Sequence, residues 1–477
     1  MSDQSKAPLL NAYLEYFGKF NLPFTIPGHK HKTKLIDSKL GQVVDVDLPL
    51  YGGLDEIKLT NGILLESEGL AAEFWGADLA RFSTGGSTHC NQAIALAIAT
   101  PGGKIAISRT SHRSLLSAIV LAGLEPIWMN PEIDPKTGVP IGIGISEIEN
   151  ALTHNPIAIF LTEPGYLGTI SDLPKIITVA HQKNVPVIID AAWGGHFGFN
   201  KKLPEHVIQL GADALVTSIH KTLPGYSASA LLLVQGKLID LNRVNQSFET
   251  THTTSPAGAP LASIDGVRAL LARSGDTLLD NLIYNCNEFK SQVENEIGRK
   301  IFLSVADFPK DRFDPVKIVL SADFLGADGV EIEKDLIAQG IKVEMADKDT
   351  IVFLATLIDQ KSDFDLLAEK LIPILKSKLG PARISQTSIS WSVKPQRVIS
   401  MREAYFSKTQ SVKYQDAIGK ISADLIAPYP PGVAVVAPGE MLTEEIILGL
   451  RSTKASGVRI AYATDSTLES FRIVSSN

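Results

Sequence analysis

The middle of the chain alternates short apolar runs with helical patterns, and this alternation restricts the fold more than any other feature. Strands are predicted at 105–108, 126–129, 157–162, 186–190, 214–218 and 230–234, and helices between them at 114–123, 146–154 and 173–184. The strands are apolar throughout, so helices must cover both faces of a mostly parallel sheet, which indicates an α/β fold. Because ligands bind beyond the C-terminal ends of such strands, we expect a site after Thr162, Asp190 and Ser218.

The rest of the chain is expected to form further units, because 477 residues exceed what a single hydrophobic core usually holds. A long helical region is expected at 261–298, with a break near 274–276. Beyond it, strands at 316–320, 341–344 and 351–354 and helices at 329–339 and 364–379 predict a smaller α+β domain, followed by a loop or linker at 380–394. We expect an irregular N-terminal arm (1–60), a large domain (61–300), a small α+β domain with the linker (301–395) and a C-terminal domain (396–477).

The composition restricts the kind of function. Hydrophobic residues at 44% and charged residues at 20% exclude a disordered chain, and a net charge of −7 argues against general nucleic-acid binding and fits small-molecule ligands. Two cysteines, Cys90 and Cys286, are too few for a disulfide framework or a cysteine-rich zinc site, and we expect no metal. We see no signal-peptide pattern and no apolar stretch of ~18 residues, so a cytoplasmic protein without a membrane partner is expected.

Two polar residues follow predicted buried strands. Lys221 lies in ALVTSIHKTLPG (214–225), where burial would lower its pKa and make a neutral, nucleophilic amine, so it is a candidate Schiff-base former; a lysine extending from a loop into water is the alternative. Asp190 ends a strand in PVIIDAAWGGHF (186–197). A carboxylate there suits the pyridine nitrogen of pyridoxal phosphate, with the small Ala192 leaving room for a flat ring, or it caps the next helix.

Two further segments complete a pattern. Gly86, Ser87 and Thr88 begin a predicted helix, whose free backbone N–H groups would suit a phosphate. His112 follows the strand at 105–108, where an imidazole could stack on a cofactor ring or lie in a solvent-exposed loop. A phosphate cradle, a stacking ring, a carboxylate and a lysine, in this chain order, are typical of fold-type I pyridoxal-phosphate enzymes.

On these and other segments the chain resembles the Orn/Lys/Arg decarboxylases, the fold-type I basic amino-acid decarboxylases, in the short form without an N-terminal wing domain. The resemblance runs from about residue 24 to about residue 474. The matching segments are IPGHK (26–30), DVDLPLYGGL (45–54), GST with Asn91 (86–91), SHRS (111–114), TEPGYLG (162–168), DAAW (190–193), TSIHKTL (217–223), THTTSP (251–256), MREA (401–404) and PYPPGVAVVAPGE (428–440).

The resemblance implies an aspartate aminotransferase-like large domain that binds pyridoxal 5'-phosphate, and a homodimer or higher homo-oligomer. The implied catalytic residues are Lys221 as the imine lysine, Asp190 as the partner of the pyridine nitrogen, His112 as the stacking ring and His220, which competes with Lys221 as the proton donor to Cα. The implied cofactor-binding residues are Gly86, Ser87, Thr88, His112, Asp190, Ala192, Trp193, Ser218, His220, Lys221 and, toward the neighbouring subunit, Thr254 and Ser255.

The implied activity is decarboxylation of a basic L-amino acid, with arginine favoured over lysine and ornithine, which fits polyamine biosynthesis as well as acid resistance. A cationic substrate needs an acidic partner, and Glu163 and Glu440 are candidates, as are Asp55 and Glu56; a solvated surface carboxylate is the alternative for each. The chain departs from the family pattern at Gly85, Glu163, Gly165 and Ala191. These departures bear on the identity of the substrate more than on the cofactor chemistry. Competing hypotheses are an aminotransferase or lyase of the same fold, and a catalytically silent regulatory homologue.

Overall fold

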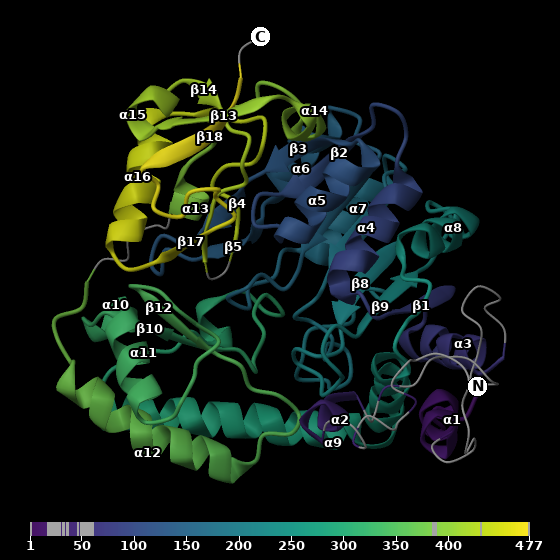
Figure 1. Ribbon diagram of the computed structural model, residues 1–477. Coiled ribbons are helices and arrows are strands. Elements are labelled where there is room, and N and C mark those ends of the chain that lie inside the picture. Colours follow the sequence, from purple (N-terminus) through teal and green to yellow (C-terminus); the bar gives the residue numbers. More distant parts are fainter. Residues whose placement is uncertain are drawn as a thin grey trace.

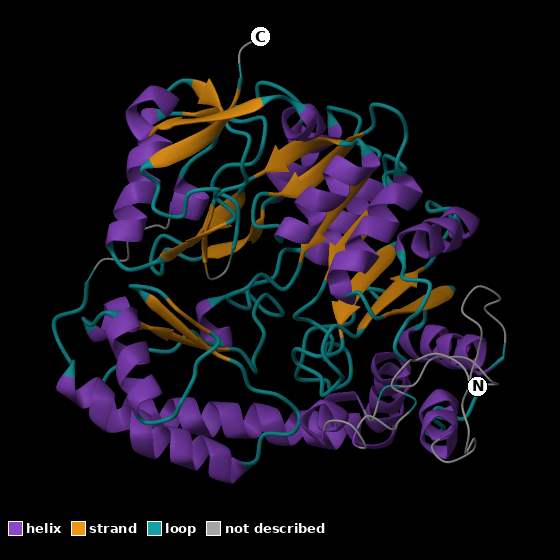
Figure 2. Ribbon diagram, in the orientation of Figure 1, coloured by secondary structure: helices purple, strands orange, loops and turns teal. Residues whose placement is uncertain are grey.

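A computed structural model describes residues 2–16, 30, 34, 38–44, 47, 62–383, 389–429 and 432–475. Figure 1 shows three parts: a large α/β domain, a small domain that lies along one long helix, and a C-terminal domain above the small one. Figure 2 shows the strands of the large sheet flanked by helices. The matching segments 26–29 and 45–54 of the sequence, and the candidates Asp55 and Glu56, lie almost wholly outside the described residues.

The large domain is built on a seven-stranded sheet. Its strands, in spatial order, are β1 (Leu79–Ser83), β9 (Ala230–Val234), β8 (Ala214–Ser218), β7 (Val187–Asp190), β6 (Ala158–Thr162), β2 (Lys104–Ser108) and β3 (Glu125–Met129). From β8 to β3 all neighbours are parallel, whereas β9 is antiparallel to both β8 and β1. The predicted mostly parallel sheet is confirmed; β1 was not predicted.

Helices cover both faces of this sheet, as the apolar strands require. The helices of this domain are α3 (Ile63–Trp75), α4 (Gly86–Ile98), α5 (Arg113–Ala122), α6 (Ile145–Leu152), α7 (Leu173–His181) and α8 (Leu241–Thr251). Successive strand residues contribute to different cores: Phe160 packs with α4, α5 and α8, whereas Ile159 packs with α3, α6 and α7. Both residues are fully buried. Because neighbouring side chains of a strand point to opposite faces of the sheet, both faces are covered.

Helix α9 (Gly258–Ile297) connects the large and small domains, and at 1.5 Å per residue its 40 residues span about 60 Å. The predicted break near 274–276 is wrong, because the helix is continuous. Gly275 is buried and a Cβ there would lie 3.3 Å from Leu271, so a small residue suits this position. The cost of one helical glycine, about 1 kcal/mol, is offset by packing along the helix.

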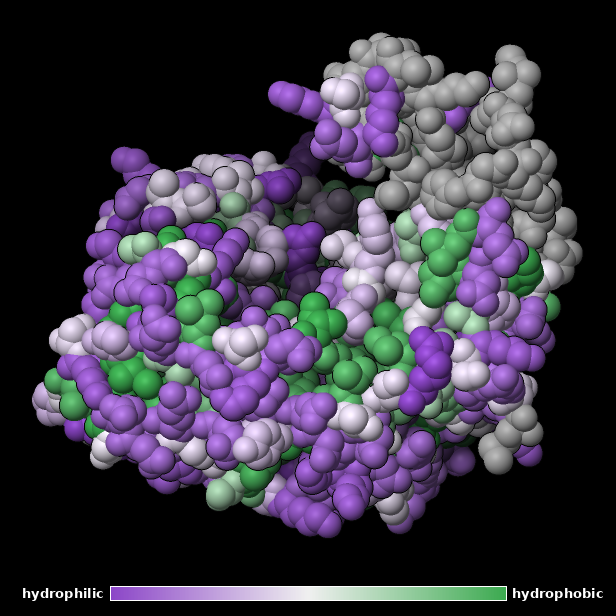
Figure 3. Space-filling model, turned by 90° about the horizontal axis from the view of Figure 1, so that it is seen from below, coloured by the Kyte–Doolittle hydropathy of each residue, from purple (hydrophilic) through white to green (hydrophobic). Residues whose placement is uncertain are grey.

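The small domain packs a three-stranded antiparallel sheet against α9 and two further helices. Its elements are η2 (Val305–Asp307), β10 (Ile318–Ser321), α10 (Ala322–Leu325), α11 (Gly329–Ala338), β11 (Met345–Ala346), β12 (Thr350–Phe353) and α12 (Lys361–Ser377). The strand predicted at 341–344 is wrong, since the only strand pairing there begins at Met345. Seen from below, the described surface is mostly hydrophilic with separate hydrophobic patches (Figure 3).

The C-terminal domain is formed by short two-stranded sheets around its own apolar core. Its elements are α13 (Ile389–Ser392), α14 (Met401–Phe406), β13 (Thr409–Lys413), α15 (Tyr414–Ala417), β14 (Lys420–Ile421), β15 (Ala427–Tyr429), β16 (Met441–Leu442), α16 (Glu444–Ala455), β17 (Arg459–Ala461) and β18 (Ser470–Val474). Helix α13 lies in the predicted linker, and the predicted arm contains α1 (Pro8–Tyr16) and α2 (Ser38–Val44). A hairpin of β4 (Pro131–Ile133) and β5 (Pro140–Ile143) completes the described elements.

None of the helices in the described part of the chain combines the length and apolar composition that a membrane crossing requires. The predicted division into four segments stays a prediction.

Candidate active site

The C-terminal ends of β6, β7 and β8 place three polar residues at one edge of the sheet. Thr162 pairs with Asp190 in the register of β6 and β7, and Ser218 ends β8 beside them. The chain bends at Ile219 and His220, directly after Ser218, and Lys221 follows. The sequence predicted a site at this edge. The structure brings Asp190 close to Lys221: burial lowers the pKa of Lys221, and the charge of Asp190 opposes that shift.

Asp190 is held by a buried hydrogen-bond network. Asn91 Nδ2 on α4 donates to Asp190 Oδ2 at 2.8 Å, and the Ala192 amide donates to Oδ1 at 3.1 Å. The same Asn91 nitrogen also donates to Ser114 Oγ at 2.8 Å, which lies 2.9 Å from His112 Nδ1. The network fixes the carboxylate between two helices. Ser114 was not predicted as a site residue, although it occurs in the SHRS segment.

The segment predicted to bind a phosphate lies at the start of α4. Gly86 has φ +68°, a left-handed conformation that favours glycine, and its amide donates to the Ala228 carbonyl at 2.7 Å. The hydroxyl oxygens of Ser87 on α4 and Ser218 on β8 lie 2.7 Å apart, and the Thr88 side chain is exposed. Two hydroxyls at a helix N-terminus suit a phosphate group.

His112 is the N-cap of α5, where its Nδ1 accepts a hydrogen bond from the Ser114 amide at 3.3 Å. The residue is exposed to solvent within the single chain. Desolvation lowers the pKa of His112; the negative charge of Asp190 opposes the shift and the positive charge of Lys221 adds to it. A neutral imidazole at this position can stack on a flat ring without adding a charge.

Two lysines contact the ring of Trp193. The Nζ atom of Lys221 is 4.5 Å from the centre of the Trp193 ring, and the Nζ atom of Lys317 is 4.1 Å from the same centre. Desolvation lowers the pKa of Lys221, although the charges of Asp190 and Glu344 act in the opposite direction. Lys317 precedes β10 and was missed by the sequence analysis, where the only signal was a lysine inside a predicted apolar strand.

The other predicted cofactor residues are distributed as follows. Ala192 is buried beside Asp190, and His220 Nδ1 donates to the Ser229 carbonyl at 3.1 Å. Thr254 and Ser255 are exposed in the loop after α8, and within one chain neither is hydrogen-bonded to Lys221 or Asp190. Their predicted role toward a neighbouring subunit stays a prediction.

The two acidic substrate candidates have partners within the chain. Both carboxylate oxygens of Glu440 accept from the Arg109 guanidinium, at 2.6 and 2.8 Å, and the Ala437 amide donates to Glu440 at 2.7 Å. Glu163 accepts from the amide and hydroxyl of Ser171, and burial raises its pKa to about 7. Both carboxylates are therefore buried and already hydrogen-bonded within the chain, and their predicted role toward a substrate cation stays a prediction.

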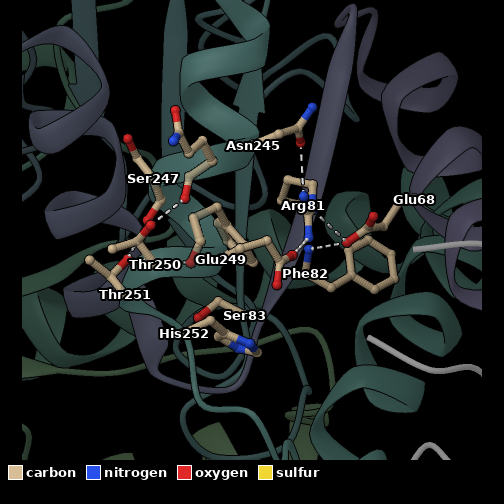
Figure 4. Close-up of polar contacts among 12 residues, drawn as sticks. Glu68, Arg81, Phe82, Ser83, Asn245, Ser247, Glu249, Thr250, Thr251 and His252 are labelled. Carbon is tan, nitrogen blue, oxygen red and sulfur yellow. Dashed lines mark hydrogen bonds and ion pairs between the residues drawn. The ribbon is translucent and has the colours of Figure 1, made fainter. Parts of the chain in front are cut away.

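Figure 4 shows a second polar group, which we call the Arg81 cluster (Glu68, Arg81, Asn245 and Glu249). Arg81 on β1 donates to Asn245 at 2.8 Å and to Glu249, both on α8, and its Nε is 3.4 Å from Glu68 on α3. The Phe82 amide donates to Glu68 at 2.8 Å. Every charge in this cluster therefore has a partner, and the cluster ties two helices to β1.

The fold and the site define a class of protein: a pyridoxal-phosphate enzyme of fold type I. The residues fit this cofactor, because hydroxyls and free amides gather at a helix N-terminus, a fixed carboxylate suits the pyridine nitrogen, and a lysine with a lowered pKa would suit the covalent link.

The chain belongs to the Orn/Lys/Arg decarboxylase family. The family's major domain matches residues 7–308 and its C-terminal domain matches residues 383–456. The chain is 31% identical to an arginine decarboxylase of Halalkalibacterium halodurans, covering 99% of each chain, and 32% identical to one of Bacillus subtilis, covering 99% of this chain and 98% of the relative. Lysine decarboxylase A from Pseudomonas aeruginosa shares the fold, with a TM-score of 0.84 at 18% identity over 99% of this chain and 81% of that one.

Proposed function

We propose that this protein decarboxylates L-arginine to the corresponding amine and CO2, in the cytoplasm, in preference to lysine or ornithine. The observation that carries the reaction class is the meeting of Lys221 and the fixed carboxylate of Asp190 at adjacent strand ends. The choice of arginine rests on the relatives that are 31–32% identical over nearly the whole chain and are named arginine decarboxylases.

Different residues of the site would bind different parts of the cofactor. Gly86, Ser87, Thr88, Ser218 and His220 would bind the phosphate, with the free amides of the first turn of α4 adding donors. His112 would stack on one face of the ring, and Ala192 and Trp193 would line the rest of the pocket. Lys221 would form the covalent link, and its lowered pKa favours the neutral, nucleophilic form of the amine.

Asp190 supplies the main electrostatic contribution. When bound, pyridoxal phosphate acts as an electron sink for the pair of electrons left when the bond between Cα and the carboxylate breaks. A carboxylate fixed by Asn91 and the Ala192 amide keeps the pyridine nitrogen protonated without having to reorganise during the reaction.

After CO2 leaves, Cα must receive a proton. Lys221 and His220 are the two candidates. Because His220 Nδ1 donates to the Ser229 carbonyl, Nε2 is the atom from which this ring would deliver a proton. We further propose a homodimer, in which the exposed Thr254 and Ser255 complete the partner's site.

The reaction is tested with the purified holoenzyme and arginine, lysine and ornithine in separate assays. We expect CO2 and the corresponding amine in equal amounts, fastest with arginine. Formation of a keto acid without CO2 would indicate an aminotransferase, and no product from any of the three would favour a silent homologue.

A further inference from the structure

Lys317 is a buried lysine whose position is fixed by aromatic and backbone contacts. Its side chain is 6% exposed, and its Nζ lies 4.1 Å from the Trp193 ring centre and 5.3 Å from that of Tyr166. Its stem packs on Gly168, where a Cβ would come within 2.8 Å of Lys317 Cγ. The side chain therefore points between two aromatic rings in the large domain, although its backbone belongs to the start of the small domain.

The nearby carboxylates do not form an ion pair with this ammonium. Asp314 Oδ1 lies 3.1 Å from His196 Nε2 and accepts from the Val316 amide at 3.1 Å. Glu344 Oε1 accepts from the Tyr166 hydroxyl at 3.0 Å. Among the described residues, Lys317 Nζ has no hydrogen bond and no carboxylate within ion-pair distance.

A buried ammonium without a hydrogen bond is costly unless a ligand supplies the missing anion. Lys290 on α9 is as buried as Lys317, yet its Nζ donates to the Pro315 carbonyl at 3.2 Å. The comparison shows that this region of the chain can provide an acceptor for a buried lysine. Lys317 instead presents an unpaired positive charge beside the ring that also contacts Lys221.

We propose that Lys317 binds the α-carboxylate of the substrate. The inference rests on the proposed function, in which an α-amino acid binds where the amine of Lys221 lies. The two Nζ atoms are no farther apart than the sum of their distances to the Trp193 ring centre. In an α-amino acid the carboxylate carbon is two bonds from the amino nitrogen, so an amino group near Lys221 places the carboxylate within the space between the two lysines.

This kind of carboxylate site suits a decarboxylase. A lysine is a point charge without the rigid fork by which arginine holds a carboxylate bidentately, and here it is surrounded by indole and phenol rings. The carboxylate loses its charge as it becomes CO2, so its attraction to Lys317 is stronger in the bound substrate than in the transition state. Such an interaction lowers KM without raising kcat, and it is absent from the product amine, which can then leave.

The test compares arginine with agmatine, the same molecule without its carboxylate. In Lys317→Met, the KM for arginine should rise about tenfold or more, while kcat changes by less than about threefold. Agmatine binding to the holoenzyme, followed by visible absorbance as well as by inhibition, should change by less than about twofold. Lys317→Arg retains the charge and should restore most of the arginine affinity.

Lys290→Met is the matched control, because it also removes a buried ammonium, and it should leave the arginine KM within about twofold of wild type. Thermal unfolding of each holoenzyme checks that the variants fold; if Lys317→Met does not, Lys317→Gln provides the same comparison. An unchanged arginine KM, or an equal loss of arginine and agmatine binding, would overturn the inference. Failure of the wild-type enzyme to release CO2 would instead contradict the proposed function.

Discussion

The Arg81 cluster and the two lysines at Trp193 show two ways in which this fold treats buried charge. Arg81 has three side-chain partners from α3 and α8, and its guanidinium also lies 4.5 Å above the Phe248 ring (Figure 4). Lys221 and Lys317 share one aromatic ring, and within the described chain neither ammonium has a hydrogen bond or ion pair. Compensated charges hold structural elements together, whereas uncompensated charges with shifted pKa values mark the place where a ligand binds.

The largest expected effect is at Lys221, on the functional side of this comparison. Lys221→Ala removes the amine that forms the covalent link, so turnover should fall on the order of 10⁴-fold or more and the visible absorbance of the bound cofactor should be lost. Stability of the folded chain should change little, since no hydrogen bond is removed. Absorbance spectra and CO2 release measure both effects, and retention of the absorbance would show that another lysine carries the cofactor.

Arg81→Met should lower the stability and leave turnover nearly unchanged, the reverse of Lys221→Ala. Removing one partner of a buried ion pair leaves Glu68 and Glu249 without their cation, which costs about 3–5 kcal/mol of unfolding free energy. The kcat of the variant that remains folded should stay within about threefold of wild type. Denaturant unfolding and steady-state kinetics measure the two quantities, and a loss of turnover with unchanged stability would reverse the comparison.

Glu68 gives a smaller, pH-dependent effect in the same cluster. Burial raises its pKa to about 7 from 4.5, although Arg81 and the Phe82 amide oppose the shift. The folded protein therefore binds this proton more tightly, and the resulting stabilisation is complete below pH 4.5 and lost as the pH rises through 7.

Glu68→Gln keeps the side chain neutral at every pH. Relative to wild type, its unfolding free energy should therefore increase between pH 5 and pH 8, by about 2–3 kcal/mol. Urea unfolding at both pH values measures the difference, and a difference that does not vary with pH would mean that Glu68 stays ionised throughout.

The smallest expected effect concerns the charge of Lys317. Burial lowers the pKa of this lysine to about 8, against the charges of Asp314 and Glu344, and the nearby charge of Lys221 adds to the shift. Loss of the proton should weaken arginine binding but not agmatine binding, so the ratio of arginine KM to agmatine inhibition constant should rise about tenfold from pH 7 to pH 9. The same ratio in Lys317→Met should not vary with pH, and parallel curves for the two proteins would exclude the proposed contact.

The residues that could be predicted are those whose role follows from local position. Asp190 and Lys221 follow apolar strands, and His112 and Ser87 lie at helix starts, so chain order alone indicates where they meet. The ion pair of Glu440 with Arg109 joins residues 331 positions apart, and no local sequence pattern indicates it.

Lys317 was missed for the same reason, because its partner rings come from segments far away in the chain. Likewise, the serine, glycine and aspartate at 274–276 indicate a helix break locally, but the packing of a long helix maintains α9 through them. The mostly parallel sheet was predictable, and the contacts between domains were not.

The central claim is that Lys221, and not the neighbouring Lys317, carries the cofactor. Borohydride reduction of the holoenzyme fixes the cofactor on its lysine, and mass spectrometry of the digested protein then identifies the modified residue. We predict a single modified peptide, the one that contains Lys221. Modification of Lys317, or of any other lysine in place of Lys221, would contradict the account.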